Sequence, residues 1–314
     1  MEVGMIDIAI GVLQQDNKVC LSLRQKHQSH AGHWEFPGGK VESSESIAEA
    51  LVREFQEELA IETTNWQPLI EIPWHYEKVS LRLHVYSTQN FVGKPVGNEG
   101  QLVKWFSLDE LSKLTFPEAN QGILTALNLA DKYMISGSFT DQEQALEKLS
   151  QAIQQGIRFC QLRAKDLTDA EFMTLALPAI KLCQQHDAKL LLNGDITLLE
   201  QFPQADGIQL ASNRIYDFTQ RPISKDKLLG VSTHTEEDIE RALKIDADFI
   251  LLSPVKETQT HPGVAGMGWQ KFSEMVKQIP IPVYALGGMK TEDVDMAKQH
   301  GGQGVAAISA FWPS

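Results

Sequence analysis

Three acidic residues in the first quarter of the chain have the spacing of a ligand set. Glu54, Glu57 and Glu58 lie three and one residues apart, so a helix would place their carboxylates on one face. Carboxylates this close repel one another unless a cation lies among them, and hard oxygen ligands suit Mg²⁺ or Mn²⁺. Because Mg²⁺ usually completes its coordination with water and substrate phosphates, the pattern indicates phosphate chemistry. The alternative for such a run is a solvated acidic helix face.

The residues before this acidic run can position the helix that carries it. Gly38 and Gly39 predict a turn, and Ser44 and Ser46 are good helix-capping residues, so we expect the helix to start near them. The backbone carbonyl of Gly39 could add a metal ligand. An apolar stripe on the opposite face would pack on the domain core, and it consists of Ile47, Ala50, Leu51, Phe55 and Leu59.

This segment resembles the Nudix box, G-x5-E-x7-R-E-U-x-E-E-x-G-U. One position departs, because Ala60 stands where the pattern has a helix-ending glycine, and this change removes no metal ligand. The resemblance implies Mg²⁺-dependent hydrolysis, with Mn²⁺ as a possible substitute, of a nucleoside diphosphate derivative. The matching residues are Gly39, Glu45, Arg53, Glu54, Phe55, Glu57, Glu58 and Ile61.

The sequence around the box narrows the resemblance to the MutT-type 8-oxo-dGTP diphosphatase family. The matching pieces are residues 9–12, 23–24, 34–40, 99–101 and 116–120. The resemblance implies that Phe36 packs on the purine, Asn120 reads the oxidised purine edge, Arg24 contacts the base and Glu99 lies near the metals. The alternatives are core packing for Phe36, a helix cap for Asn120 and a surface ion pair for Arg24.

The resemblance also implies a mechanism. Water attacks the β-phosphorus of 8-oxo-dGTP, and the products are 8-oxo-dGMP and pyrophosphate, which would keep oxidised nucleotides out of DNA. Either Glu54 or Glu99 is the general base, and Arg53 orients a carboxylate through Glu45. The implied catalytic residues are Arg53, Glu54, Glu57 and Glu99, and the implied metal ligands are Gly39, Glu54, Glu57, Glu58 and Glu99.

The elements that must position these residues have a mixed pattern. Strand-like runs occur at residues 6–13, 19–23, 69–72 and 80–86, and one strong helical pattern lies at 47–59. A second helix is expected after residues 116–120 and runs to about residue 129. This order favours an α+β domain over residues 1–130. The resemblance implies the Nudix fold, an α/β/α sandwich with a mixed sheet.

From residue 131 to 314 the rhythm changes to alternating strands and helices. Eight short apolar runs alternate with helix-length segments, which is typical of a (β/α)8 TIM-type barrel, although residues 211–227 look irregular. The runs lie at residues 133–136, 159–162, 189–193, 207–210, 228–232, 249–253, 283–286 and 304–308.

The barrel half resembles thiamine-phosphate synthase and its thiazole tautomerase relatives over residues 133–311. The resembling pieces fall at the carboxyl ends of the expected strands, where barrel active sites form. The resemblance implies a phosphate site, with a phosphorylated thiazole-type compound as its ligand. Its residues would be Arg163, Lys165, Asn193, Gly287, Gly288, Ile308 and Ser309.

Four departures from this family's pattern concern its chemistry. Gly194 stands in place of a magnesium-binding aspartate, with Asp195 displaced by one position, and residues 212–214 lack the second aspartate. Gln259 replaces a phosphate-binding lysine, and Pro254 stands where the tautomerases have a histidine. Three interpretations remain open: an active thiamine-phosphate synthase, another enzyme with a phosphorylated ligand, or a retained ligand-binding or structural module.

The whole-chain composition limits the classes of partner. The chain has 314 residues and a net charge of 28 − 41 = −13, which disfavours binding to duplex nucleic acid. Three cysteines suggest a reducing compartment, and no apolar run could span a membrane. We therefore expect a cytoplasmic protein that acts on a small nucleotide. The alternatives are hydrolysis of another nucleoside diphosphate or a thiamine-pathway diphosphate, or a regulatory protein with a silent barrel.

Overall fold

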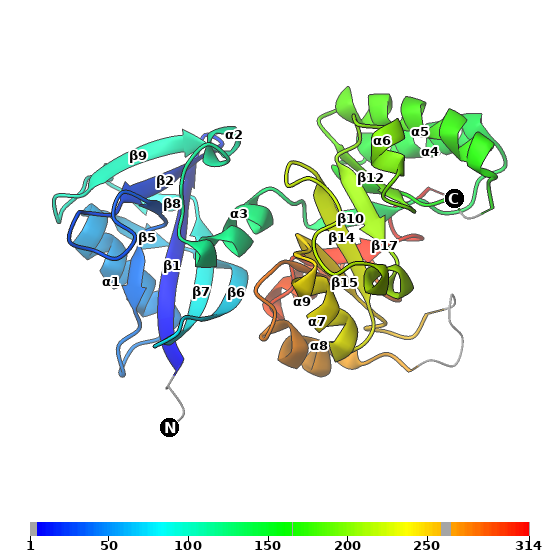
Figure 1. Cartoon of the computed structure of the whole chain (residues 1–314). Helices are drawn as coiled ribbons and strands as arrows, with labels where there is room; N and C mark the ends of the chain where they lie inside the picture. The colour runs from blue at the N-terminus through cyan, green and yellow to red at the C-terminus, as the bar shows by residue number, and fades with distance from the viewer. Residues whose placement is uncertain (1–4, 165, 259–264, 314) are drawn as a thin grey trace. The chain divides into compact units, whose positions relative to one another are not determined.

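The computed structural model describes residues 5–164, 166–258 and 265–313. These residues form two compact units, which are described separately (Figure 1). The first unit comprises residues up to Asn128 together with Lys277–Ile281, and the second comprises Leu129–Val276 and the residues from Pro282 onward. Within the described part of the chain, no helix has both the length and the apolar character that a membrane span requires.

The first unit is built on a mixed sheet with the strand order β3-β2-β1-β7-β6. Strands β1 and β7 pair in parallel, whereas the other pairs are antiparallel; β4 also pairs with β1 and β9 with β2. A separate two-stranded sheet joins β5 to β8. The strands are β1 Met5–Gln15, β2 Lys18–Leu23, β3 Trp34–Glu35, β4 Gly38–Lys40, β5 Glu62–Thr64, β6 Gln67–His75, β7 Ser80–Thr88, β8 Asn90–Val92 and β9 Leu102–Ser107.

Helices cover both faces of this sheet, because successive side chains of a strand point to opposite faces. On β1, Ala9 and Leu13 pack with helix α1 (Ile47–Leu59), whereas Ile10 and Val12 pack on the other side with helix α3 (Gln121–Leu127). Two short elements, α2 (Leu108–Leu111) and the 3-10 turn η1 (Glu118–Asn120), complete the unit. The predicted α/β/α sandwich with a mixed sheet is therefore confirmed.

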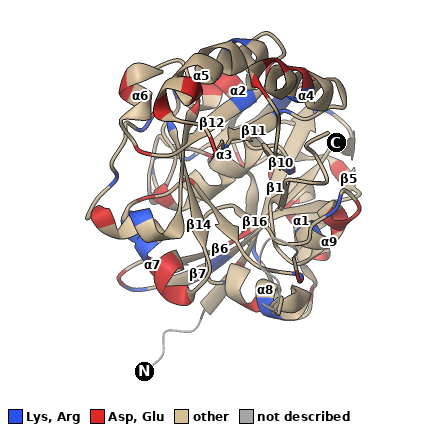
Figure 2. Cartoon of the chain, turned by 90° about the vertical axis from the view of Figure 1, so that its right-hand side faces the viewer, with Lys and Arg blue, Asp and Glu red and all other residues tan. Residues whose placement is uncertain are grey.

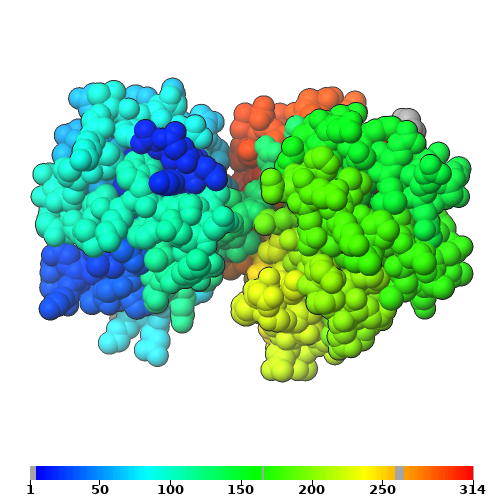
Figure 3. Space-filling view, turned by 90° about the horizontal axis from the view of Figure 1, so that it is seen from above, coloured from blue at the N-terminus to red at the C-terminus, as the bar shows by residue number. Residues whose placement is uncertain are grey.

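The second unit is a closed barrel of eight parallel strands in chain order, as predicted. Figure 2 shows the charged residues mainly on helices and loops, and Figure 3 shows the surface of the chain coloured by residue number. The strands are β10 Lys132–Ile135, β11 Phe159–Leu162, β12 Lys189–Asn193, β13 Gly207–Leu210, β14 Leu228–Thr233, β15 Phe249–Leu252, β16 Val283–Ala285 and β17 Gly304–Ala307.

The helices of the barrel are uneven in length, which explains how it fits into fewer residues than usual. The longer ones are α4 (Gln142–Gln154) and α5 (Asp169–Gln184), whereas α6 (Leu198–Gln201) has one turn. The segment after β13 contains the 3-10 turn η2 (Ser212–Asp217) in place of an α-helix. The remaining helices are α7 Glu236–Lys244, α8 Gly268–Val276 and α9 Asp293–Gln299.

Four aromatic rings fill the barrel interior. Tyr133, Phe159, Phe249 and Tyr284 are fully or almost fully buried, and the rings of Tyr133 and Phe159 stack with their centroids 4.1 Å apart. The phenol oxygen of Tyr133 lies 3.1 Å from the side-chain amide of Gln209. The interior is therefore a packed core, as in other barrels of this type.

Candidate active site

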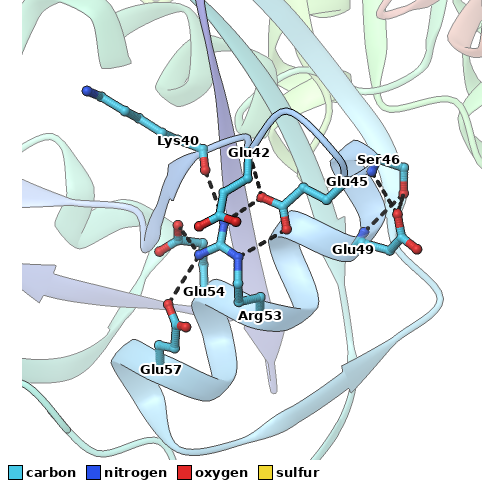
Figure 4. A network of polar contacts seen from close by, with 8 residues as sticks. All are labelled: Lys40, Glu42, Glu45, Ser46, Glu49, Arg53, Glu54 and Glu57. Carbon is cyan, nitrogen blue, oxygen red and sulfur yellow. Dashed lines mark hydrogen bonds and ion pairs between the residues drawn. The ribbon is translucent and has the colours of Figure 1, made fainter.

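One arginine organises the acidic face of α1 (Figure 4). The Arg53 guanidinium forms two hydrogen bonds to Glu45, with Nη2 2.6 Å from Oε1 and Nε 3.0 Å from Oε2. Its Nη1 atom lies 2.7 Å from Glu54 and 3.2 Å from Glu57, and Nη2 also donates to the Lys40 carbonyl. Arg53 therefore fixes the directions of three carboxylates and joins the turn to the helix.

The glycine turn lets Glu54 approach the backbone of β4. A Cβ atom on Gly39 would lie 2.2 Å from Glu54 Oε1, so only glycine leaves room for the carboxylate. Strand pairing places Gly39 opposite Ala9 of the central strand β1. Burial raises the pKa of Glu54 above its usual value, and the neighbouring Arg53 opposes this rise. The turn and the helix thus enclose a carboxylate that is only partly compensated.

Glu58 is the most strongly perturbed acid of the group. Burial, together with the charges of Glu54, Glu35 and Glu99, raises the pKa of Glu58 to about 8. The Gly38 N–H donates to its Oε2 at 3.3 Å and gives limited compensation. The carboxylates of Glu58, Glu54, Glu35 and Glu99 therefore lie near one another, and their negative charge is poorly compensated.

The loop that contains Glu99 is hydrogen-bonded to the C-terminal end of α1, which places Glu99 near Glu58. The side chain of Asn98 donates to the Glu57 carbonyl at 2.9 Å, and that of Gln101 donates to the Glu58 carbonyl at 3.1 Å. These bonds satisfy carbonyls that the helix end leaves unpaired. Gln25 donates to the Glu99 carbonyl at 2.9 Å. Sequence reasoning assigned a role to Glu99 but not to Asn98 or Gln101, because their bonds join distant segments.

The described residues contain no group of three or more His, Cys, Asp or Glu side chains already arranged to hold a metal ion. In this structure Arg53 forms ion pairs with both Glu54 and Glu57. The chemistry of the donors nevertheless fits a divalent cation, since they are carboxylate oxygens around the uncompensated Glu58. The residues that would hold the ion are Gly39, Glu54, Glu57, Glu58 and Glu99.

The three residues expected at the base lie in different surroundings. Phe36 is 3% exposed and packs in the α3-side core, with its ring stacked on Phe116 at 5.9 Å. Asn120 is 6% exposed and stands at the start of α3, but its side chain makes no capping bond or other hydrogen bond to a described residue. Arg24 forms an ion pair with Glu35, and about one fifth of each side chain is exposed. Asn120 therefore occupies the N-cap position of α3 without capping the helix through its side chain.

The barrel residues expected to bind phosphate lie at the carboxyl ends of the strands. Gly287 and Gly288 have φ angles of +99° and +63°, and neither N–H has a hydrogen-bond partner in the described chain. Successive free N–H groups in such a turn form an anion-binding concavity. Arg163 follows β11, and Asn193 donates to the Gln209 carbonyl at 3.1 Å. The other expected residues are Ile308 and Ser309, which follow β17, and Lys165, which lies outside the described residues together with Gln259.

The barrel positions that correspond to a family magnesium site hold an arginine. Arg214 lies 2.6 Å from Asp195 and 2.8 Å from Asp217. Hydrogen bonds from Thr197 and from Arg214 lower the pKa of Asp195. With Gly194 beside them, these residues do not fit a divalent cation, because the one displaced carboxylate is already neutralised by a guanidinium.

Comparisons with known proteins agree with both units. Residues 132–311 match the family model for thiamine monophosphate synthase, and residues 8–126 match the NUDIX domain model. An Aquifex aeolicus protein provisionally named thiamine-phosphate synthase 2 is 34% identical over 187 residues, which is 59% of this chain and 99% of that protein. The thiamine-phosphate synthase of Methanobrevibacter smithii is 28% identical over 57% of this chain and 86% of its own length.

A solved structure is similar to the Nudix part of the chain. The MutT structure from a study of Aliivibrio salmonicida and Vibrio cholerae is 32% identical, covers 40% of this chain and 97% of that one, and has a TM-score of 0.36. The fold and the sites together define a Nudix domain fused to a synthase-type barrel. The chain belongs to the thiamine monophosphate synthase family, whose model covers more than half of it, and its first unit is a Nudix domain.

Proposed function

We propose that the first unit is a Mg²⁺-dependent pyrophosphohydrolase that converts 8-oxo-dGTP into 8-oxo-dGMP and pyrophosphate. One observation carries this proposal: Glu58 is buried beside the carboxylates of Glu54, Glu35 and Glu99, and burial together with these charges raises its pKa to about 8. Such a site gains stability from a divalent cation and its phosphate ligand. The name of the solved MutT structure and the Nudix model support the same chemistry. Mn²⁺ has the same preference for oxygen ligands and would substitute for Mg²⁺.

The chain's own residues would supply orientation and proton transfer. The cation, when held by the acidic group, neutralises phosphate charge and lowers the pKa of water. Arg53 keeps Glu54 and Glu57 in fixed directions through its three carboxylate contacts. A carboxylate oxygen of Glu54 or Glu99 would accept the proton of the attacking water. The loop bonds of Asn98 and Gln101 hold Glu99 beside the helix end.

Base recognition would come from the residues on the α3 side of the sheet. Phe36 offers an apolar ring, and Asn120 has a buried amide with no hydrogen bond to a described residue. An amide donates and accepts at once, so it can pair with the N7–H and an adjacent oxygen of an 8-oxo-purine. Leaving the amide unpaired against an undamaged purine would cost about 1–3 kcal/mol, which supports discrimination.

The test compares hydrolysis of 8-oxo-dGTP, dGTP and thiamine diphosphate by the full chain with Mg²⁺. We expect kcat/KM to be highest for 8-oxo-dGTP, with pyrophosphate as the second product. Preference for thiamine diphosphate or for undamaged dGTP would replace this substrate with the corresponding alternative. Absence of hydrolysis of all three compounds would contradict the enzyme assignment.

The role of Glu57 has its own test. Glu57→Gln keeps the shape of the side chain but removes a charged ligand, so we expect kcat to fall by at least about 10³-fold. The melting temperature should stay close to that of the native chain, because the Glu57 side chain is 56% exposed. Glu62→Gln, at an exposed position of β5, is the matched control and should retain activity. Near-normal turnover by Glu57→Gln would refute the assignment.

For the barrel we propose a retained phosphate-ligand module without magnesium chemistry. The observation that favours this proposal is the engagement of Asp195 by Arg214, together with the free N–H groups of Gly287 and Gly288. We expect calorimetry to detect thiazole phosphate binding in EDTA, and we expect no joining of thiazole phosphate with pyrimidine diphosphate. Pyrophosphate release in that joining assay would instead identify an active synthase.

A further inference from the structure

We propose that Glu35 positions Arg24 for recognition of the base, an inference that rests on the function proposed above. The two residues come from neighbouring antiparallel strands, since Ser22 pairs with Glu35 and Leu23 with Trp34. Arg24 directly follows the last residue of β2, and its Nη1 atom donates to Oε2 of Glu35. The carboxylate therefore fixes one edge of the guanidinium.

The other edge of Arg24 is fixed by the loop that follows β2. Nε donates to the Ser29 carbonyl at 2.5 Å, and Nη2 donates to the Ser29 hydroxyl at 3.0 Å. The Arg24 backbone also bonds to the far end of the loop: its N–H donates to the His33 carbonyl and its carbonyl accepts from the Gly32 N–H, each at 3.0 Å. A guanidinium has five N–H donors, so three bond to these residues and two remain for a ligand oxygen. The group is held in one plane before any ligand binds.

Glu35 is close to the acidic group as well as to Arg24. Its charge acts on the Glu58 carboxylate, which shows that the two are near each other. Phe36, the residue proposed to pack on the purine, is its neighbour in the chain. Glu35 forms its ion pair with Arg24, the residue proposed to contact the nucleobase. We therefore place Glu35 with the nucleobase-binding residues and not with the cation ligands. The geometry therefore makes Glu35 a positioning residue for Arg24, and a role as a further cation ligand becomes the outcome to exclude.

The same sheet contains an ion pair that serves as a matched control. Glu71 on β6 and Arg82 on β7 lie 3.3 Å apart, with exposure close to that of the Arg24–Glu35 pair. Among the described residues, neither has a hydrogen bond or ion pair with the acidic group or with the residues proposed at the base. Glu71→Gln therefore measures what loss of an ion pair of similar exposure in the same sheet does to the fold alone.

The test measures calorimetric binding of 8-oxo-dGMP in EDTA and, separately, hydrolysis of 8-oxo-dGTP with Mg²⁺. For Glu35→Gln we expect about tenfold weaker binding of 8-oxo-dGMP, the equivalent of about one charge-assisted hydrogen bond. The loss should appear in KM with little change in kcat, whereas Glu71→Gln should bind and react normally. In an Arg24→Ala background, Glu35→Gln should cause no further loss of affinity.

Three results would overturn the inference. One is that Glu35→Gln binds 8-oxo-dGMP as tightly as the native chain does, provided that the native chain prefers 8-oxo-dGMP to dGMP. The second is an equal loss with and without Arg24. The third is a fall in kcat at unchanged KM and unchanged EDTA binding, which would place Glu35 at the cation. If the native chain neither prefers nor hydrolyses the oxidised nucleotide, the proposed function fails and the inference fails with it.

Discussion

Glu58 connects the electrostatics of the site to the stability of the first unit. Its carboxylate is buried beside Glu54, Glu35 and Glu99, and its main compensation is one long hydrogen bond from Gly38. In the unfolded chain the same group ionises near the ordinary glutamate pKa of 4.5. Between this value and about 8, the folded chain therefore binds more protons than the unfolded chain at this position.

The pH dependence of unfolding follows from this difference. As pH rises from about 5 to about 8, the free energy of unfolding of the metal-free first unit should fall by about 2–5 kcal/mol, since ionised Glu58 destabilises only the folded state. Urea unfolding in EDTA at several pH values measures this slope. The slope should be reduced in Glu58→Gln and by saturating Mg²⁺. An unchanged slope in Glu58→Gln would contradict the assignment.

At the residue scale, local spacing predicted part of the site and long-range contacts supplied the rest. Arg53 lies one residue from Glu54, four from Glu57 and eight from Glu45, and these intervals bring the four side chains together within one turn and helix. The contacts of Asn98 with the helix end join residues 41 positions apart, and no local pattern encodes them. The pairing of Glu35 with Arg24 also depends on strand register, which composition does not reveal.

Helix α1 is well capped at its N-terminal end and strained at its C-terminal end. Ser46 and Glu49 form a reciprocal capping box at its start. At its end, Ala60 adopts a left-handed conformation with φ +55°, where its Cβ is strained and glycine is not. This is the position at which the sequence departs from the Nudix pattern. The helix that carries the acidic group is therefore strained at its C-terminal end.

Removing this strain should stabilise the first unit. We expect Ala60→Gly to raise the free energy of unfolding by about 1 kcal/mol, because glycine adopts the left-handed region without a Cβ clash. Ala48→Gly, at an exposed position in the same helix, should instead lower it. Urea denaturation of both variants beside the native chain measures the two effects. A destabilised Ala60→Gly variant would show that the Ala60 methyl group contributes packing that outweighs its strain.

At the element scale, the barrel strands were predicted closely and several Nudix strands were missed. Buried parallel strands such as Phe159–Leu162 and Gly207–Leu210 read as continuous apolar runs, so their bounds follow from the sequence. Strand β9 was missed because it has one face partly exposed, with Lys104 in its middle. Strands β3 and β4 have two and three residues, too few for a periodic pattern.

At the scale of the whole chain, each unit has a hydrophobic core of its own. A ligand that binds one folded unit raises the free energy of opening of that unit, by about 2.7 kcal/mol at a concentration 100 times Kd. We therefore expect Mg²⁺ with 8-oxo-dGMP to slow hydrogen exchange in peptides from residues 5–127 and to leave barrel peptides unchanged. Mass spectrometry measures this, with Glu57→Gln as the control. Equal protection of both units from hydrogen exchange would contradict the expectation that the ligand acts on the first unit alone.

The aromatic filling of the barrel has an optical consequence. Tyr133 and Tyr284 are completely enclosed, and burial raises the pKa of both phenols well above the usual value. Their hydroxyls can lose a proton to alkali only after the surrounding strands separate. The near-ultraviolet absorbance of tyrosinate from these two residues is therefore a built-in, label-free signal for the disassembly of the eight-stranded unit.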